Sequence, residues 1–188
     1  QVTIINNRPT TADAGSNKAT CNSSIQLAAN RDILGDGEWT IRSGSGEFSS
    51  VTDPNATVDN LSFGANVFRW TIRNGSCISF DDVQVDYNSI PADAGDDRTI
   101  CSDTEILSAN SAEPGTGTWS VVGGTSQAVF DDPHDPNTTV RNLRKGNNTL
   151  RWTVEYKGCQ TYDEVVIANN SPSTAYAGNL QKLCSDET

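Results

Sequence analysis

One stretch of the chain occurs twice, and its spacing constrains what the chain can fold into. Residues 66–77 read Asn-Val-Phe-Arg-Trp-Thr-Ile-Arg-Asn-Gly-Ser-Cys, and residues 148–159 read Asn-Thr-Leu-Arg-Trp-Thr-Val-Glu-Tyr-Lys-Gly-Cys. In both copies apolar residues alternate with polar ones up to a Gly-containing turn, which is the pattern of a half-buried β-strand. Trp70 and Trp152 lie 82 residues apart. The chain is therefore predicted to contain two copies of one strand-rich unit.

Nearly the same offset recurs at other positions. Trp39 and Trp119 lie 80 residues apart, and Cys21, Cys101 and Cys184 follow one another at intervals of 80 and 83. We therefore expect two full repeats, over residues 12–91 and 92–172. Residues 1–11 are expected to hold the last strand of a preceding repeat, and residues 173–188 the start of a following one. The chain is then a window of a longer array, and export and anchoring would be functions of other parts of the parent protein.

Each repeat is predicted to be an all-β sandwich. A short strand ends at Cys21 or Cys101, a second runs over residues 25–29 or 106–109, a third carries Trp39 or Trp119, and the last runs over residues 82–87 or 164–168. About seven short strands with frequent turn signals and no helical period favour tandem immunoglobulin-like antiparallel β-sandwiches. Four tryptophans fall on the apolar side of the alternation and are expected in the cores: Trp39, Trp70, Trp119 and Trp152.

The net charge and the cysteines limit the partners and the cellular compartment that are expected. The net charge is -11 and the sequence pI is about 4.3, which argues against nucleic acid and anionic membranes as partners. No apolar run is long enough to insert this segment into a membrane. The five cysteines stand at repeat-locked positions without the clustering of a zinc site, which predicts disulfides and an oxidising compartment. We expect an extracellular or cell-surface protein.

The repeat motifs resemble a known family. The motif comprises Pro-Ala-Asp-Ala-Gly at residues 91–95, Cys101, Gly-Thr-Trp at 117–119, the strand at 146–154 and Gly-Cys at 158–159. This set resembles the PKD-like immunoglobulin-fold repeats of very large Bacteroidetes cell-surface proteins, over both full and both partial repeats. Such repeats occur in adhesins and gliding-type surface proteins exported by the type IX secretion system. The resemblance implies a PKD-like sandwich and brings no catalytic residues, so none are assigned and no enzyme is expected.

Polar residues that could carry chemistry have plainer explanations. His134 lies among carboxylates, but Thr52 takes its place in the first repeat and no nucleophile accompanies it, so it is interpreted as a loop residue. Six acidic residues recur at the junctions or at the last strand and are candidate calcium ligands: Asp13, Asp93, Asp81, Asp82, Asp163 and Glu164. Tyr176 replaces the junctional Asp at the third junction, so the prediction is solubilising charge, with calcium possible and no other cofactor.

Two disulfide patterns are open. Pairing within repeats, Cys21 with Cys77 and Cys101 with Cys159, is the simpler one and is favoured; it leaves Cys184 without a partner. In an immunoglobulin-like order, however, Cys21 falls near the end where the chain leaves the first sandwich, and Cys77 near the end where it arrives. Because disulfide Cα atoms must approach within about 7 Å, Cys21 with Cys159 across the junction is the rival.

Three functions are compatible with these features. The favoured one is a structural spacer or stalk within a long secreted adhesin or fibre, in which the partners are the neighbouring repeats of the same chain. A ligand-binding module is the first alternative, with surface polysaccharide, other cells or calcium-dependent adhesion as its targets. An accessory domain of a secreted hydrolase is the second alternative.

Overall fold

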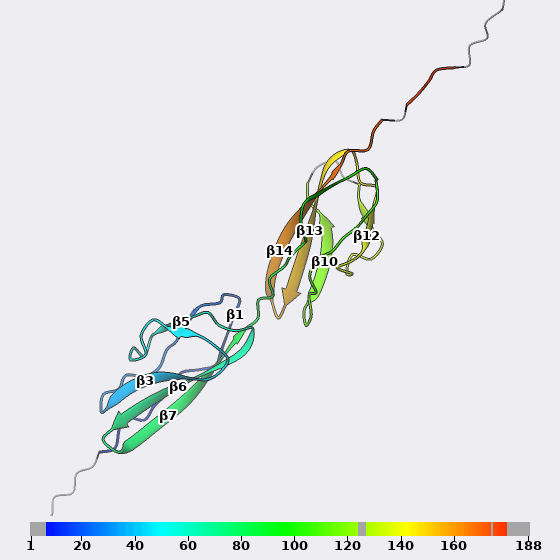
Figure 1. The fold of residues 1–188 in the computed structure, drawn as a ribbon. Helices are drawn as coiled ribbons and strands as arrows, with labels where there is room; N and C mark the ends of the chain where they lie inside the picture. The colour runs from blue at the N-terminus through cyan, green and yellow to red at the C-terminus, as the bar shows by residue number, and fades with distance from the viewer. Residues whose placement is uncertain (1–6, 124–126, 174, 180–188) are drawn as a thin grey trace, which may run out of the picture.

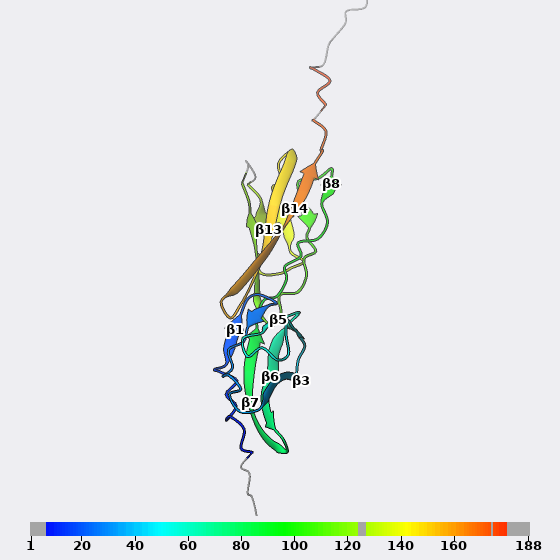
Figure 2. The same ribbon diagram turned by 90° about the vertical axis from the view of Figure 1, so that its left-hand side faces the viewer.

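The computed structural model describes residues 7–123, 127–173 and 175–179, and it shows two β-sandwiches placed end to end (Figures 1 and 2). Residues 1–6, where most of the strand expected within residues 1–11 would lie, and Cys184 are outside the described residues. The described part contains no helix that could cross a membrane.

Seven strands of the described chain build the first sandwich. Their bounds are β1 (Lys18–Thr20), β2 (Ile25–Gln26), β3 (Asp36–Ser43), β4 (Glu47–Phe48), β5 (Thr57–Asp59), β6 (Gly64–Asn74) and β7 (Cys77–Tyr87). One sheet has the order β1-β7-β6-β3 and the other has the order β2-β5-β4.

The second sandwich repeats this arrangement. Its strands are β8 (Arg98–Ile100), β9 (Glu105–Ile106), β10 (Thr116–Val121), β11 (Val129–Phe130), β12 (Thr139–Arg141), β13 (Gly146–Tyr156) and β14 (Cys159–Asn169). The sheet orders are β10-β13-β14-β8 and β11-β12-β9, which match the first sandwich strand for strand. The predicted all-β, immunoglobulin-like fold is confirmed, and each strand predicted within residues 12–172 has a counterpart.

One pairing in each sandwich is parallel rather than antiparallel. β1 pairs with β7 in the register Lys18 to Val85, and β8 pairs with β14 in the register Arg98 to Ile167. The first strand of each sandwich thus runs in the same direction as the last one. Both therefore end at the same, C-terminal end of the sandwich, a placement that decides where Cys21 lies.

The last strand is longer than expected. It starts at the cysteine itself, since β6 and β7 pair continuously from Gly64 with Tyr87 to Asn74 with Cys77. The first half of β7 was not predicted because its apolar residues face outward. Ile78 and Phe80 are more than half exposed, whereas Val83 and Val85, in the second half, are buried. Alternation alone could not assign residues that place apolar side chains on the solvent face.

Paired tryptophans form the centre of each core, as predicted. Trp39 lies opposite Trp70 and Trp119 opposite Trp152, with ring centroids 5.1 and 5.2 Å apart, and all four are at most 2% exposed. A buried Trp removes about 150–250 Å² from water, worth at most roughly 4–6 kcal/mol at about 25 cal/mol/Å². Two such residues dominate the core of a sandwich this small.

A glycine makes room for the second tryptophan of each pair. A Cβ atom on Gly117 would overlap the indole ring of Trp152, and a Cβ on Gly37 would overlap that of Trp70. The glycine that precedes each third-strand tryptophan by two residues is therefore required by packing on the same face of the strand.

Candidate functional site: the junction between the sandwiches

A disulfide joins the two sandwiches. Cys21 follows β1 at the C-terminal end of the first sandwich, and Cys159 begins β14 at the N-terminal end of the second. Their Cα atoms are 5.3 Å apart and the sulfur atoms are bonded, across 138 residues of sequence. The bond ties the first strand of one sandwich to the last hairpin of the next.

The favoured pairing within repeats is wrong, and the rival pairing is the one formed. Thr20 pairs with Tyr87 at one end of β7, whereas Cys77 is the residue at its other end. Ten residues of antiparallel strand rise about 34 Å, far beyond the roughly 7 Å that disulfide Cα atoms allow. The same geometry separates Cys101 from Cys159, and both Cys77 and Cys101 have free thiols.

The linker between the sandwiches is short and held on both sides. The Asn88 amide donates to the Thr20 carbonyl of the first sandwich at 3.0 Å. The Thr161 hydroxyl of the second sandwich donates to the Ile90 carbonyl at 2.6 Å. Only Ser89 separates these two anchored residues. The linker is therefore a fixed connection with one intervening residue.

An aromatic pair also crosses the junction. Phe63, from the turn before β6, lies with its ring centroid 5.6 Å from that of Tyr156, at the end of β13. Phe63 comes from the connection between the two sheets of the first sandwich, and Tyr156 from the β13–β14 hairpin of the second. A tilted aromatic pair at this distance is worth about 0.5–1.5 kcal/mol beyond its buried area.

The turn that presents Phe63 is itself fixed by a buried amide. Asn66 is 0% exposed, and its Nδ2 donates to the carbonyls of Ser62 and Gly64, on either side of Phe63, at 2.8 and 3.1 Å. Its Oδ1 accepts from the Ser62 and Ser45 amides. The side chain thus replaces the backbone partners that a tight turn lacks.

The sequence did not reveal the aromatic pair or the Thr161 contact. Lys145 occupies the position of Phe63 in the second repeat and Asn74 occupies that of Tyr156, so the repeat pattern does not mark either ring. The only available signal was that Phe63 follows an expected strand as an apolar residue beside a glycine, which fits an exposed turn as well as an interface.

The junctional acidic residues cap backbone amides. Asp81 Oδ2 accepts from the Ala14 amide, and Asp163 Oδ2 accepts from the Ala94 amide, both at 2.8 Å. Asp13 and Asp93 each accept, at 2.9 Å, from the amide of the glycine two residues later. Asp81 and Asp163 thus hold the incoming chain against the last strand of the sandwich that it enters, whereas Asp13 and Asp93 close tight turns within that incoming chain.

The remaining two calcium candidates form ion pairs on the outer face of the sheet. Asp82 accepts from Nε and Nη2 of Arg69 at 2.7 and 2.8 Å, and Glu164 pairs with Arg151. The Arg69 hydrogen bond lowers the pKa of Asp82 despite some opposing desolvation, and the guanidinium also covers Phe80, 3.9 Å from its ring centroid. Among the described residues no group of three or more His, Cys, Asp or Glu side chains is arranged to hold a metal.

His134 has a structural contact in the second sandwich. Its Nδ1 lies 2.9 Å from the Gly117 carbonyl and 3.3 Å from the Thr118 hydroxyl. It lines a half-open cavity of about 260 Å³ together with Glu113 and Trp152. In the first sandwich Asp32 stands at the repeat position of Ala112, and its carboxylate accepts a hydrogen bond from the Gly37 amide.

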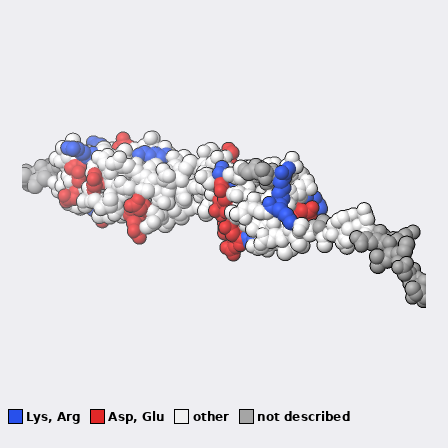
Figure 3. Space-filling model, turned by 90° about the horizontal axis from the view of Figure 1, so that it is seen from above, with Lys and Arg blue, Asp and Glu red and all other residues white. Residues whose placement is uncertain are grey.

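Charges of both signs are mixed over the surface. On the face drawn in Figure 3, Asp and Glu form patches separate from those of Lys and Arg on both sandwiches, and one acidic patch is a band near the start of the second sandwich. This face has no continuous basic stripe of the kind that follows a nucleic acid backbone.

Comparison with known proteins yields likeness only in structure. No protein-family model matches the chain, and no curated protein matches it. The PKD domain from the KIAA 1837 protein is similar at 22% identity and a TM-score of 0.40, covering 48% of this chain and 95% of that one.

Two structures with several domains in tandem are similar over most of the chain. A three-domain titin fragment is 11% identical with a TM-score of 0.41, covering 88% of this chain and 67% of that one. Extracellular domains 3–5 of Drosophila OTK are 10% identical with a TM-score of 0.34, covering 86% of this chain and 59% of that one. At these values the fold assignment rests on strand order and register rather than on the likenesses.

Proposed function

We propose that this chain is a segment of structural spacer, in which sandwiches such as those within residues 12–91 and 92–172 set the length and direction of a stalk. The observation that carries the proposal is the junction. A disulfide bridges it, and a single residue separates its two anchored linker residues. Domains joined by a small interface normally move relative to each other. A disulfide across the junction restricts this motion.

The parent protein is proposed to be a long secreted adhesin or fibre at a cell surface. A disulfide between sandwiches persists in oxidising compartments, which supports an extracellular location. The resemblance of the repeat motifs supports a Bacteroidetes surface protein of the gliding type, exported by type IX secretion. In such a protein the segment would act without catalysis or cofactor, and adhesion would be carried by other parts of the parent.

Small-angle X-ray scattering tests the spacer proposal. The oxidised chain should give one elongated shape that a single rigid arrangement fits. The double variant Cys21→Ser/Cys159→Ser should scatter as a broader ensemble with a smaller mean end-to-end extent. Cys77→Ser/Cys101→Ser is the matched control, because it also removes two cysteines but leaves the bridge, and it should scatter as the parent does. An oxidised chain that scatters as flexibly as the double variant would refute the proposal.

A further inference from the structure

We propose that Cys77 and Cys101 form the same bridge with the neighbouring repeats, so that every junction of the array carries one disulfide. Cys101 would bond to the hairpin cysteine of the following repeat, and Cys77 to the first-strand cysteine of the preceding one. The proposal rests on the proposed function, because it requires that further repeats flank this segment.

The register of the strands places each free thiol where its bonded counterpart stands. Cys21 follows a residue of β1 that pairs with the last residue of β7, and Cys101 follows a residue of β8 that pairs with the last residue of β14. Cys77 and Cys159 are both the first residues after the hairpin turn, paired with Asn74 and Tyr156. Equivalent registers give the free and the bonded cysteines the same position at their sandwich ends.

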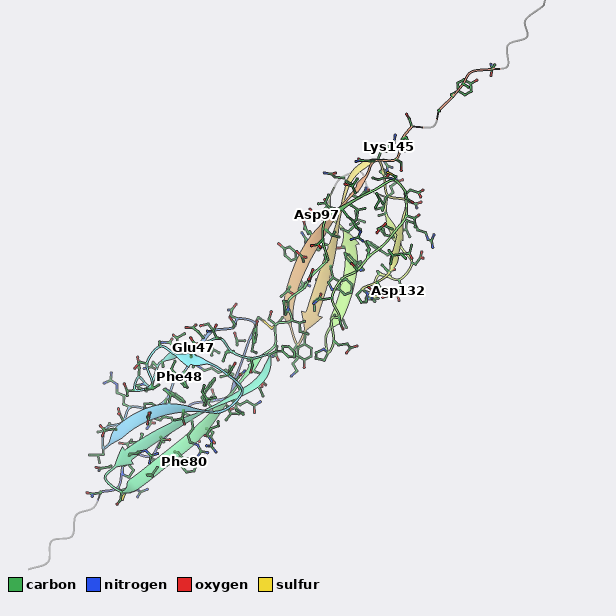
Figure 4. The ribbon with its side chains drawn as sticks, viewed as in Figure 1. Glu47, Phe48, Phe80, Asp97, Asp132 and Lys145 are labelled. Atoms are coloured by element: carbon green, nitrogen blue, oxygen red, sulfur yellow. A yellow bond between two sulfur atoms is a disulfide. The ribbon has the colours of Figure 1, made fainter. Side chains whose placement is uncertain are left out.

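The free cysteines Cys77 and Cys101 are too far apart to form a disulfide with each other. Cys77 lies at the N-terminal end of the first sandwich and Cys101 at the C-terminal end of the second, so two strand lengths of about 34 Å each separate them. Both therefore lie at the outer ends of the two sandwiches, where the next repeats would join. Figure 4 shows Lys145, which takes the position of Phe63, at this outer end of the second sandwich.

The chemistry is an oxidation of two thiols. Each new S–S bond removes two protons and two electrons from a pair of cysteines. The acceptor would be the disulfide of a thiol–disulfide oxidoreductase, which is reduced to its dithiol as the bond is transferred. No other bond of the chain changes.

These bridges would create a covalent strap that bypasses most of the chain. Cys77 and Cys101 are 24 positions apart, and the segment between them passes from one end of the first sandwich to the far end of the second. Its fully extended length is about 80–86 Å at 3.3–3.6 Å per residue. The two sandwiches together measure roughly 70 Å from their strand lengths, so the strap has only about 10–15 Å of slack.

Two such straps run side by side through each sandwich. In the second sandwich one strap is β14, which starts at the bridged Cys159, and the other comprises the linker and β8. They are paired in parallel, and the Asp97 carboxylate on one accepts from the Val166 amide on the other at 2.7 Å. The parallel pairing thus joins the two segments that would carry tension, and the other strands would be shielded from it.

The test is a chain in which one repeat is duplicated. Residues 1–171 followed by residues 90–188 place a second copy of the second sandwich after the first, since Ser171 corresponds to Ser89. Gln160→Asn in the added copy marks its Cys159 peptide by mass. Non-reducing peptide mapping should find Cys101 of the first copy linked to the marked Cys159, besides the Cys21 link. Titration should find three free thiols among seven cysteines.

Two controls make the result decisive. Cys101→Ser in the first copy should free the marked Cys159 and leave the Cys21 link intact, whereas the same change in the added copy should alter neither link. A marked Cys159 that is free in the parent duplicate, or linked to the Cys101 of its own copy, would overturn the proposal. Small-angle scattering from the same protein tests the spacer function separately. A rigid rod that lacks the second bridge would refute the proposed bridge but not the spacer function. A flexible shape with both bridges refutes the spacer.

Discussion

Reduction of the Cys21–Cys159 bond should lengthen this chain under tension by a calculable amount. The bond closes a loop of 138 residues, and force applied at the two chain ends passes through the bond rather than through the loop. At about 3.5 Å per residue, the loop conceals about 480 Å of contour length. With the bond intact, the residues outside the loop can extend to only about 170 Å in total.

Single-molecule force spectroscopy with marker domains at both ends measures this length. When the oxidised chain unfolds completely, its contour length should be about 480 Å shorter than that of the reduced chain. Adding a reductant should release this length. Cys21→Ser should give the long contour without reductant, while Cys101→Ser should behave as the parent does. If the oxidised parent releases the full contour of its loop, the disulfide does not carry the load and the reasoning is refuted.

Further predictions concern packing, the turns, pH and metal. Gly117→Ala should lower the free energy of unfolding by about 1–3 kcal/mol, measured in urea, because its Cβ has no space beside Trp152. Asn148→Ala should cost about 2–4 kcal/mol, because three backbone carbonyls lose the buried amide donor, whereas exposed Asn147→Ala should change little. Asp82→Asn should lower the urea midpoint at neutral pH. Because folding lowers the Asp82 pKa, this difference should be full above about pH 4 and vanish as the pH falls further. Calcium titration by calorimetry should give no binding heat, since the six candidate carboxylates already accept hydrogen bonds; saturable heat would contradict their structural role.

Strand positions and core residues could be predicted because the repeat displays them twice. Trp39 and Trp70 sit in alternating segments whose counterparts have the same pattern, so one copy supports the interpretation of the other. The first half of β7 was not predicted because Phe80 lies on the solvent face, where Arg69 of the neighbouring strand covers it. Local alternation does not contain cross-strand information.

The sequence reduced the disulfide pairing to two alternatives but could not decide between them. Equal spacing makes Cys21 a plausible partner of either hairpin cysteine, and the choice depends on which end of the sandwich holds the end of the first strand. The parallel pairing of β1 with β7 decides it, because it places Cys21 about 34 Å from Cys77. Phe63 and Tyr156 were missed for another reason: each makes its contact in the neighbouring sandwich and has no repeat counterpart.

The distance between Cys77 and Cys101 tests the central claim most directly. Their free thiols mark the two outer ends of the paired sandwiches and can carry spin labels in a Cys184→Ser background. Double electron–electron resonance should give one narrow distribution centred at roughly 70 Å for the oxidised chain, as expected for two strand lengths in series across a fixed junction. A broad distribution that reaches far shorter distances while the Cys21–Cys159 bond is intact would contradict the account of this segment as a rigid spacer.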